Sequence, residues 1–136
     1  MPSRLPLLFM AAAATCLVCG VALGIGMGIA HDFQLMPVHA HTNLVGWASL
    51  ALMGLTFRAW PELAKGRLAV VQFALSAGSA FVFPPGIYLA IMHGTPGLAI
   101  AAGMVWFLGA VLFLGRLLRL AFTGAPRSVA DLVPAE

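Results

Sequence analysis

The chain has 136 residues, of which 62% are hydrophobic and only 8% charged. Soluble domains are about 45–50% apolar and about 25% charged, and small folds bury the smallest share of their chain, so this composition excludes a water-soluble domain. The formal net charge is +3, but the basic residues are sparse and form no patch. We therefore expect the lipid bilayer as the surroundings of the chain, and no nucleic-acid partner.

Four apolar runs follow one another along the chain, and each is long enough for a spanning helix, which needs ~20 residues. They cover approximately residues 5–30, 38–57, 68–92 and 97–118. The connections are short, so consecutive helices should be antiparallel neighbours. The sequence therefore predicts an all-α integral membrane four-helix bundle, formed by a single domain over residues 1–136.

The first run carries a ridge of small residues, which lets another helix approach closely. Its members stand at four-residue spacing: Ala12, Cys16, Gly20, Gly24 and Gly28. The partner is either a helix of the same chain or a neighbouring subunit. No His follows Cys16 and Cys19, which argues against a Cys-x-x-Cys-His haem attachment motif, and both are expected to be packing residues. The run exceeds the ~7–15 residues of a secretory signal core, which favours a retained helix.

The basic residues indicate the orientation. All seven fall on one side of a four-helix arrangement: Arg4, Arg58, Lys65, Arg67, Arg116, Arg119 and Arg127. The positive-inside rule then places both termini in the cytoplasm. In a bacterial-type inner membrane, the opposite end of the multi-pass bundle would face the periplasm.

Prolines mark the edges and one interior point of the runs. Pro37, Pro61 and Pro96 stand at expected helix edges, where proline is tolerated. Pro84 and Pro85 instead fall within the third run, where they should interrupt and kink the helix. Such breaks persist in membranes where neighbours or a cavity satisfy the backbone, which indicates a cavity on the outer side.

All four histidines fall in the outer half of the expected bundle: His31, His39, His41 and His93. Polar side chains inside a membrane are expensive and usually functional. A single histidine at the membrane edge is typical of an interfacial residue, and we interpret His31 in that way. The second run begins with His39-Ala40-His41-Thr42-Asn43, which indicates a binding site instead.

The spacing of the histidine pair limits its chemistry. Residues two apart on an α-helix point about 200° apart, so His39 and His41 cannot hold one metal ion together and must face different neighbours. Imidazole without a carboxylate suits haem iron, copper or zinc. Apolar side chains on the same helix favour haem, namely Trp47, Met53 and Phe57.

The segment from His39 to Trp47, continuing through Gly54 to Pro61, resembles subunit I of the haem-copper oxidase superfamily. It looks closest to the cbb-type oxidases and the related nitric oxide reductases. In that family one helix carries His-x-His, whose members bind two different haems, and in the cbb-type enzymes another carries His-Thr-Asn. The resemblance implies haem b as cofactor, with His41 as ligand of the low-spin haem and His39 of the high-spin haem.

The size of the chain extends the resemblance. The family fold has three arcs of four helices, and this chain has the length of one arc, which implies a homo-oligomer, namely a homotrimer. Three further copper-site histidines of the family have no match here, nor do the arginines that hold haem propionates. Oxygen or nitric oxide reduction is therefore not expected of this chain alone, and whether it is an enzyme stays open.

The leading hypothesis is a haem b membrane protein for electron transfer, or for binding haem or a diatomic gas. His41 is the expected axial ligand, and the second ligand is His39 or His41 of another copy, or His93. One alternative is a small oligomeric channel or transporter with histidines lining an outer vestibule. Another is an accessory protein of a larger respiratory complex, in which the histidines pack. The sequence does not identify a redox partner.

Overall fold

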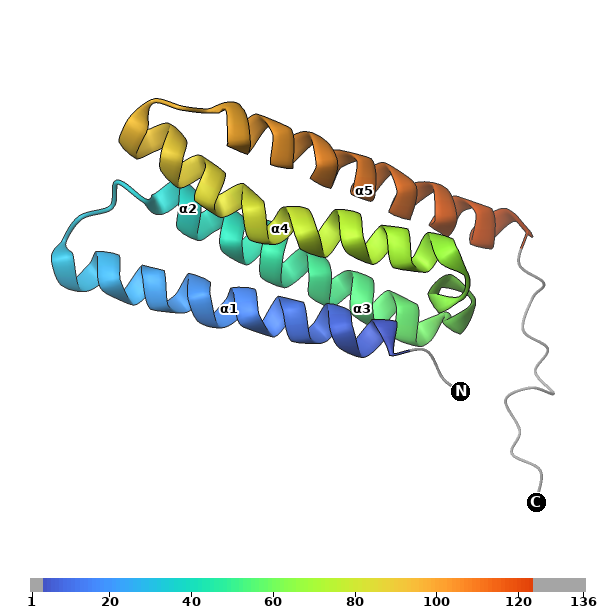
Figure 1. The fold of residues 1–136 in the computed structure, drawn as a ribbon. Helices are drawn as coiled ribbons and strands as arrows, with labels where there is room; N and C mark the ends of the chain where they lie inside the picture. Colours follow the sequence, from blue (N-terminus) through green and yellow to red (C-terminus); the bar gives the residue numbers. More distant parts are fainter. Residues whose placement is uncertain (1–3, 124–136) are drawn as a thin grey trace, which may run out of the picture.

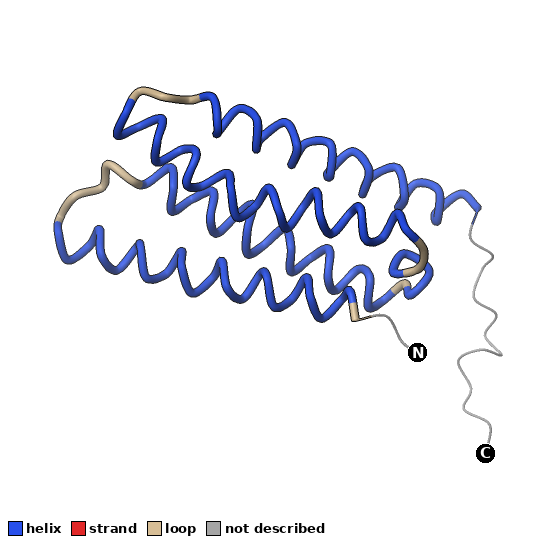
Figure 2. Tube along the Cα trace, in the orientation of Figure 1, coloured by secondary structure: helices blue, strands red, loops and turns tan. Residues whose placement is uncertain are grey.

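The computed structural model describes residues 4–123, which leaves Arg127 outside the described residues. Within that range the chain is helical and contains no strand, as expected (Figures 1 and 2). The elements in chain order are α1 (Leu5–Ala30), α2 (Met36–His41), the π-helix η1 (Thr42–Ala48), α3 (Ser49–Ala59), the 3₁₀ turn η2 (Pro61–Ala64), α4 (Arg67–His93) and α5 (Gly97–Thr123).

Three of these helices are long and apolar enough to cross a membrane: α1, α4 and α5. The second expected run is divided among α2, η1 and α3, which follow one another without a gap from Met36 to Ala59. None of the three pieces alone has the length of a span. That they cross the bilayer together as one rod stays a prediction.

The helix bounds lie within two residues of the expected ones, except that α5 continues to Thr123. Left-handed residues end two of the helices: His31 after α1, with φ 51°, and Gly94 after α4, with φ 66°. Such a residue turns the chain out of the helix while its N–H still bonds the last turn. Proline stands in the first turn of α2 and directly before α5.

The expected interruption at Pro84 and Pro85 is wrong, because α4 runs through both prolines as one helix. Each proline removes one hydrogen bond to the preceding turn, and the bonds on either side carry the helix past the gap. A pocket of about 180 Å³ is lined in part by both prolines, and its expected position on the outer side of a membrane stays a prediction.

Neighbours in sequence are neighbours in space. Figure 1 shows α5 beside α4, and α1 on the other side of the rod formed by α2 and α3. The buried core is aromatic near the start of α1, where the Phe9 ring meets Phe57 and Phe73 edge-on at centroid distances of 5.2 and 5.0 Å. Edge-on aromatic pairs contribute about 0.5–1.5 kcal/mol beyond their area burial.

The outward faces of the helices are apolar. Large hydrophobic side chains stand exposed along the whole length of the bundle, for example Leu7, Ile29, Leu52 and Ile100. A soluble monomer rarely exposes apolar patches of that extent. These faces therefore fit a lipid bilayer.

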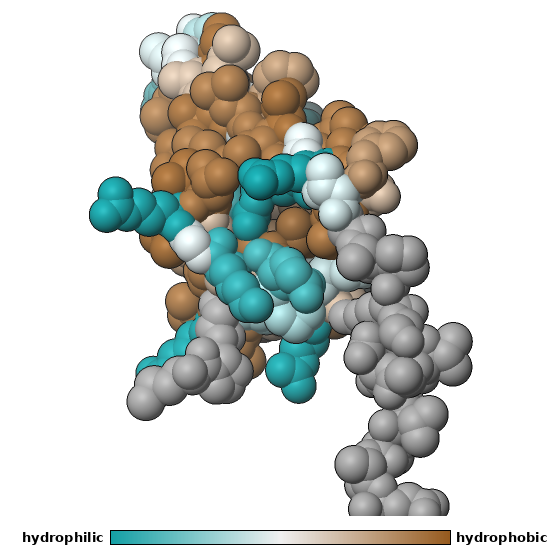
Figure 3. All heavy atoms as spheres, turned by 90° about the vertical axis from the view of Figure 1, so that its right-hand side faces the viewer, coloured by the Kyte–Doolittle hydropathy of each residue, from teal (hydrophilic) through white to brown (hydrophobic). Residues whose placement is uncertain are grey.

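The basic side chains gather at one end of the bundle. Figure 3 views the end at which α1 starts and α5 finishes, and hydrophilic side chains cover much of it below an apolar body. The six described Lys and Arg residues stand just before α1, between the end of α3 and the start of α4, and in the last turns of α5. The described basic residues, which the sequence predicted on one side of the bundle, thus lie at one end of it.

Candidate functional site

The histidine-rich start of the second rod lies between two helices. α1 packs against η1 and α3, while α4 packs against α2 and η1. Polar side chains of α2 and η1 therefore face protein on two sides.

His39 faces α1. Its Nδ1 lies 2.8 Å from the carbonyl oxygen of Gly20, and the ring is half-buried. A Cβ atom built on Gly24 would stand 2.8 Å from the Cε1 of His39. The imidazole thus occupies space that Gly24 leaves open and bonds the backbone of Gly20.

The small-residue ridge of α1 therefore has its partner within the same chain. A Cβ on Gly20 would lie 2.4 Å from the Asn43 amide nitrogen, and Cys16 lies against Gly46 in the same close manner. Gly28, at the end of the ridge, has nothing within 4 Å of such a Cβ. Of the two partners that the sequence left open, the structure shows the helix of the same chain over the first part of the ridge.

His41 faces α4 instead. Its Nδ1 lies 2.8 Å from the carbonyl oxygen of Pro37, one turn earlier. Its ring meets the edge of Phe83 at a centroid distance of 5.1 Å. The prediction that His39 and His41 face different neighbours is confirmed.

Both imidazoles are held through the same nitrogen. A carbonyl oxygen only accepts hydrogen bonds, so Nδ1 of His39 and of His41 must carry the proton and donate it. In a neutral ring this leaves a lone pair on Nε2, which is the usual state of a metal-ligating histidine whose other nitrogen is fixed by a carbonyl. Each neutral ring thus has a lone pair on Nε2, and the two rings face different helices.

The helix changes type directly after His41. Thr42–Ala48 forms a π-helix, with i→i+5 hydrogen bonds. Two hydroxyl groups accompany it: Thr42 donates to Val38 O at 2.8 Å, and Ser49 donates to Leu44 O at 2.7 Å. Short π-helical turns within α-helices are frequent at functional sites. No pattern in the sequence predicted this turn.

A small pocket lies between α1, η1 and α4, and it is lined mainly by apolar or weakly polar side chains. Its volume is about 180 Å³, and its lining residues are Cys16, Cys19, Thr42, Ala80, Phe81, Pro84 and Pro85. Ligand pockets usually measure about 300–1,000 Å³. This pocket is therefore too small for a macrocycle, and a haem on His41 would need a further surface to cover it.

Neither His39 nor His41 lines this pocket, and the other predicted site residues are exposed. Trp47 is 42% exposed on η1. His93 is exposed at the end of α4, where its ring lies 6.3 Å from the ring of Tyr88. His31 is exposed in the loop after α1. Among residues 4–123, no three or more His, Cys, Asp or Glu side chains form a group that could hold a metal ion.

Met53 and Phe57, which the sequence analysis expected around a haem, lie away from the histidines. Both side chains are buried in the core that contains Phe9, at the other end of the rod. Met53 stands twelve residues after His41, which is roughly 18 Å along a helix at 1.5 Å per residue. Of the three apolar residues expected around haem, Trp47 alone is close along the chain to the histidines.

A second pocket, at the basic end, was missed by the sequence analysis. Its volume is about 330 Å³ and its lining includes Lys65, Arg116 and Arg119. The signal in the sequence is Arg116, which stands one turn further into the last apolar run than Arg119.

Comparison of the chain with protein-family models, curated proteins and solved structures found no match.

Proposed function

We propose that this chain is a haem b-binding protein of a bacterial-type inner membrane, with His41 as an axial ligand of the haem iron. The observation that carries the proposal is the bond from His41 Nδ1 to the carbonyl of Pro37 at 2.8 Å. It fixes the ring and leaves the lone pair on Nε2, as in histidines that ligate metals. Phe83 supports the ring from α4.

His39 has a different part in this proposal. Its ring bonds the Gly20 carbonyl and fills the space beside Gly24 of α1, so it holds the start of the second rod against the first helix. In this role His39 positions the segment that carries His41. The second ligand of the iron would then come from a histidine of another copy or from His93.

A second copy also supplies the cover that one chain lacks. Leu44 and Trp47 are 66% and 42% exposed on η1, shortly after His41. An apolar face beside a ligand suits the flat macrocycle, because haem buries a large apolar surface. The homotrimer rests on the resemblance to one arc of the oxidase subunit, and closed cyclic oligomers are common in general.

Haem bound in this way supplies one-electron transfer when two histidines hold the iron, or an open position for a diatomic gas when one does. Residues of this chain fix the imidazole, exclude water with Leu44 and Trp47, and leave the propionates to water or backbone amides. In the proposed orientation both termini are cytoplasmic, Met36–Ala59 spans the membrane as a fourth helix, and the histidines face the periplasm.

The test is an absorption spectrum of the full chain purified in detergent, first oxidised and then reduced with dithionite. A Soret band with sharp reduced α and β bands indicates low-spin, bis-His haem b. We expect His41→Ala to abolish or strongly weaken this spectrum. His31→Ala is the matched control, because His31 is exposed in a loop, and it should keep full haem.

Two results would contradict the proposal. Equal haem content in both variants would remove the assignment to His41. A wild-type chain without a Soret band, even after haem is added, would favour the accessory protein. The bond between His39 and Gly20 fits that alternative, because it gives a histidine a packing role without any cofactor.

A further inference from the structure

The pocket at the basic end combines cationic and apolar walls. It measures about 330 Å³ and lies between η2, the start of α4 and the last turns of α5. Its lining residues are Glu62, Leu63, Lys65, Leu68, Arg116, Arg119, Leu120 and Thr123. Three cationic side chains against one carboxylate favour an anion, while the three leucines favour a ligand with an apolar part.

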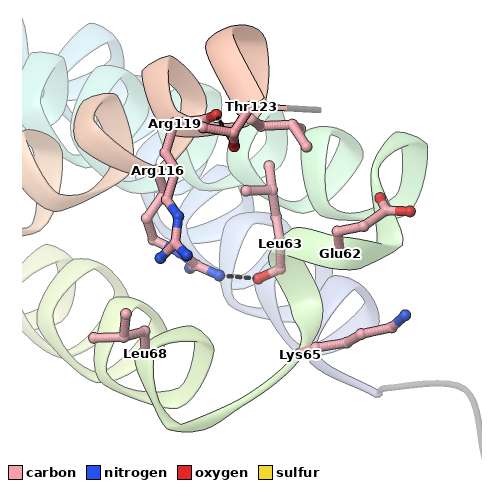
Figure 4. Close-up of a pocket in the computed structure, with 8 residues that line it drawn as sticks. Glu62, Leu63, Lys65, Leu68, Arg116, Arg119 and Thr123 are labelled. Atoms are coloured by element: carbon pink, nitrogen blue, oxygen red, sulfur yellow. Dashed lines mark hydrogen bonds between the residues drawn. The ribbon is translucent and has the colours of Figure 1, made fainter. Parts of the chain in front are cut away.

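Arg116 connects two walls of this pocket. One of its guanidinium nitrogens, Nη2, donates to the carbonyl of Leu63 in η2, as Figure 4 shows. The guanidinium carbon also lies 5.0 Å from the centroid of the Phe57 ring. The charge of Arg116 is thus met by a carbonyl and an aromatic face, neither of which neutralises it.

The hydrogen-bonding capacity of Arg116 is not filled. Its second terminal nitrogen, Nη1, is buried and has no hydrogen-bond partner among residues 4–123. An unpaired buried donor on a charged group is costly. Figure 4 shows Glu62 and Lys65 directed away from Arg116, so Glu62 does not supply the missing acceptor.

The position of Arg116 in the bundle indicates where the missing acceptor comes from. Arg116 stands seven residues before Thr123, the last residue of α5, which is roughly 10 Å at 1.5 Å per residue. A charge at that distance from the end of a spanning helix lies near the level of lipid headgroups. Arg119 lies one turn further out on the same face of α5.

We propose that this pocket binds the phosphate headgroup of an anionic phospholipid. Arg116 and Arg119 would donate to the phosphate oxygens, since guanidinium groups match phosphate geometry with paired hydrogen bonds. Lys65 adds charge at the mouth, and Leu68 and Leu120 contact the glycerol and upper acyl chain. Basic pockets between helices on the cytoplasmic side of membrane proteins are typical sites for such headgroups. This site is independent of haem.

The test compares lipid retention by native mass spectrometry. The full chain, purified in an uncharged detergent, is mixed with micelles that contain either dioleoylphosphatidylglycerol or dioleoylphosphatidylcholine. We expect preferential retention of the anionic lipid by the wild type. Arg119→Gln should lower the apparent affinity about tenfold, the loss expected for one charge-assisted hydrogen bond.

Two further variants make the test specific. Arg58→Gln is the matched control, because Arg58 is exposed at the same end but does not line the pocket, and it should retain the lipid as the wild type does. Arg116→Gln should also lose the lipid, but it breaks the bond to Leu63. Arg119→Gln is therefore the deciding variant, because the Arg119 side chain is exposed and, unlike that of Arg116, does not bond Leu63.

Three outcomes would overturn the proposal. One is equal retention of both lipids by the wild type. Another is equal loss of anionic lipid from Arg119→Gln and Arg58→Gln, since that would indicate a diffuse surface effect. The third is displacement of the lipid by inorganic phosphate at matched concentration, which would assign the pocket to a soluble phosphate.

Discussion

The imidazole Nδ1 of His39 donates to the backbone carbonyl of Gly20, at 2.8 Å, and so joins the second helical rod to the first. The contact depends on small residues in α1, because a Cβ at Gly24 would stand 2.8 Å from the same ring. The glycine ridge and the histidine motif, which were separate features of the sequence, are the two halves of one interface.

This interface separates the roles of the two histidines. His39→Ala should lower the free energy of unfolding by about 1–3 kcal/mol, because it removes a hydrogen bond and the packing of the ring. His41→Ala should cost less than His39→Ala in the haem-free chain, since the His41 hydrogen bond stays within its own helix and only its ring contact with Phe83 reaches α4. Thermal unfolding of the haem-free chain, followed by circular dichroism in detergent, measures both. A larger loss for His41→Ala than for His39→Ala would contradict this assignment.

Free imidazole offers a second check on His41. In His41→Gly or His41→Ala, added imidazole should restore part of the low-spin haem spectrum, because it replaces the missing Nε2 ligand. The same addition should not change the spectrum of His31→Ala. Failure of imidazole to restore any band, in a variant that has lost haem and is still folded, would indicate that His41 supports the site without binding iron.

The contact of α4 with α5 depends on Gly86. A Cβ at this position would lie 2.6 Å from the backbone nitrogen of Ala99 and 2.8 Å from its Cα. Backbone atoms cannot move aside cheaply, so Gly86→Ala should cost about 1–3 kcal/mol by overpacking. Gly78→Ala, in the same helix, meets nothing within 4 Å, and should be neutral or stabilising by up to about 1 kcal/mol. Equal melting temperatures for the two variants would refute this packing.

A buried amide also joins α4 to α5. Gln72 is fully buried, and its Nε2 donates to Ser76 Oγ at 2.9 Å and to Gly109 O at 2.8 Å. Hydrogen bonds between membrane helices contribute about 0.6–2 kcal/mol, so Gln72→Leu should destabilise the chain by that order. Gln34→Leu makes the same chemical change in an exposed loop, and unfolding in detergent should show almost no effect there.

Reporter fusions test whether the second rod crosses the membrane. Alkaline phosphatase, which is active only outside the cytoplasm, should be active when fused after Asp32 and inactive when fused after Lys65. The physical reason is the positive-inside rule, since Arg58, Lys65 and Arg67 surround the second junction and no Lys or Arg lies near the first. Equal activity at both junctions would mean that Met36–Ala59 does not span.

Some of these features could be predicted from the sequence because they depend on local properties. Hydropathy and length determined α1, α4 and α5 as apolar helices, and Pro37 and Pro96 marked helix starts because proline lacks an N–H. The one-sided charge pattern likewise needs only residue order. The divergence of His39 and His41 followed from helix geometry alone.

Other features were decided by tertiary packing. The helix that packs on the small-residue ridge of α1 cannot be identified from the sequence, because it depends on the shape of the opposing surface. In the structure Asn43 and His39 lie close to this ridge. The π-helix after His41 could not be predicted from local sequence, because its segment packs between α1 and α4. The position of Met53 in the core with Phe9 could not be predicted, because the sequence does not show which face of the helix packs against the other helices. In the sequence, Arg116 is one of several basic residues expected on the cytoplasmic side. Its place in a pocket depends on the tertiary structure, because η2 packs beside α5 and Arg116 bonds Leu63 there.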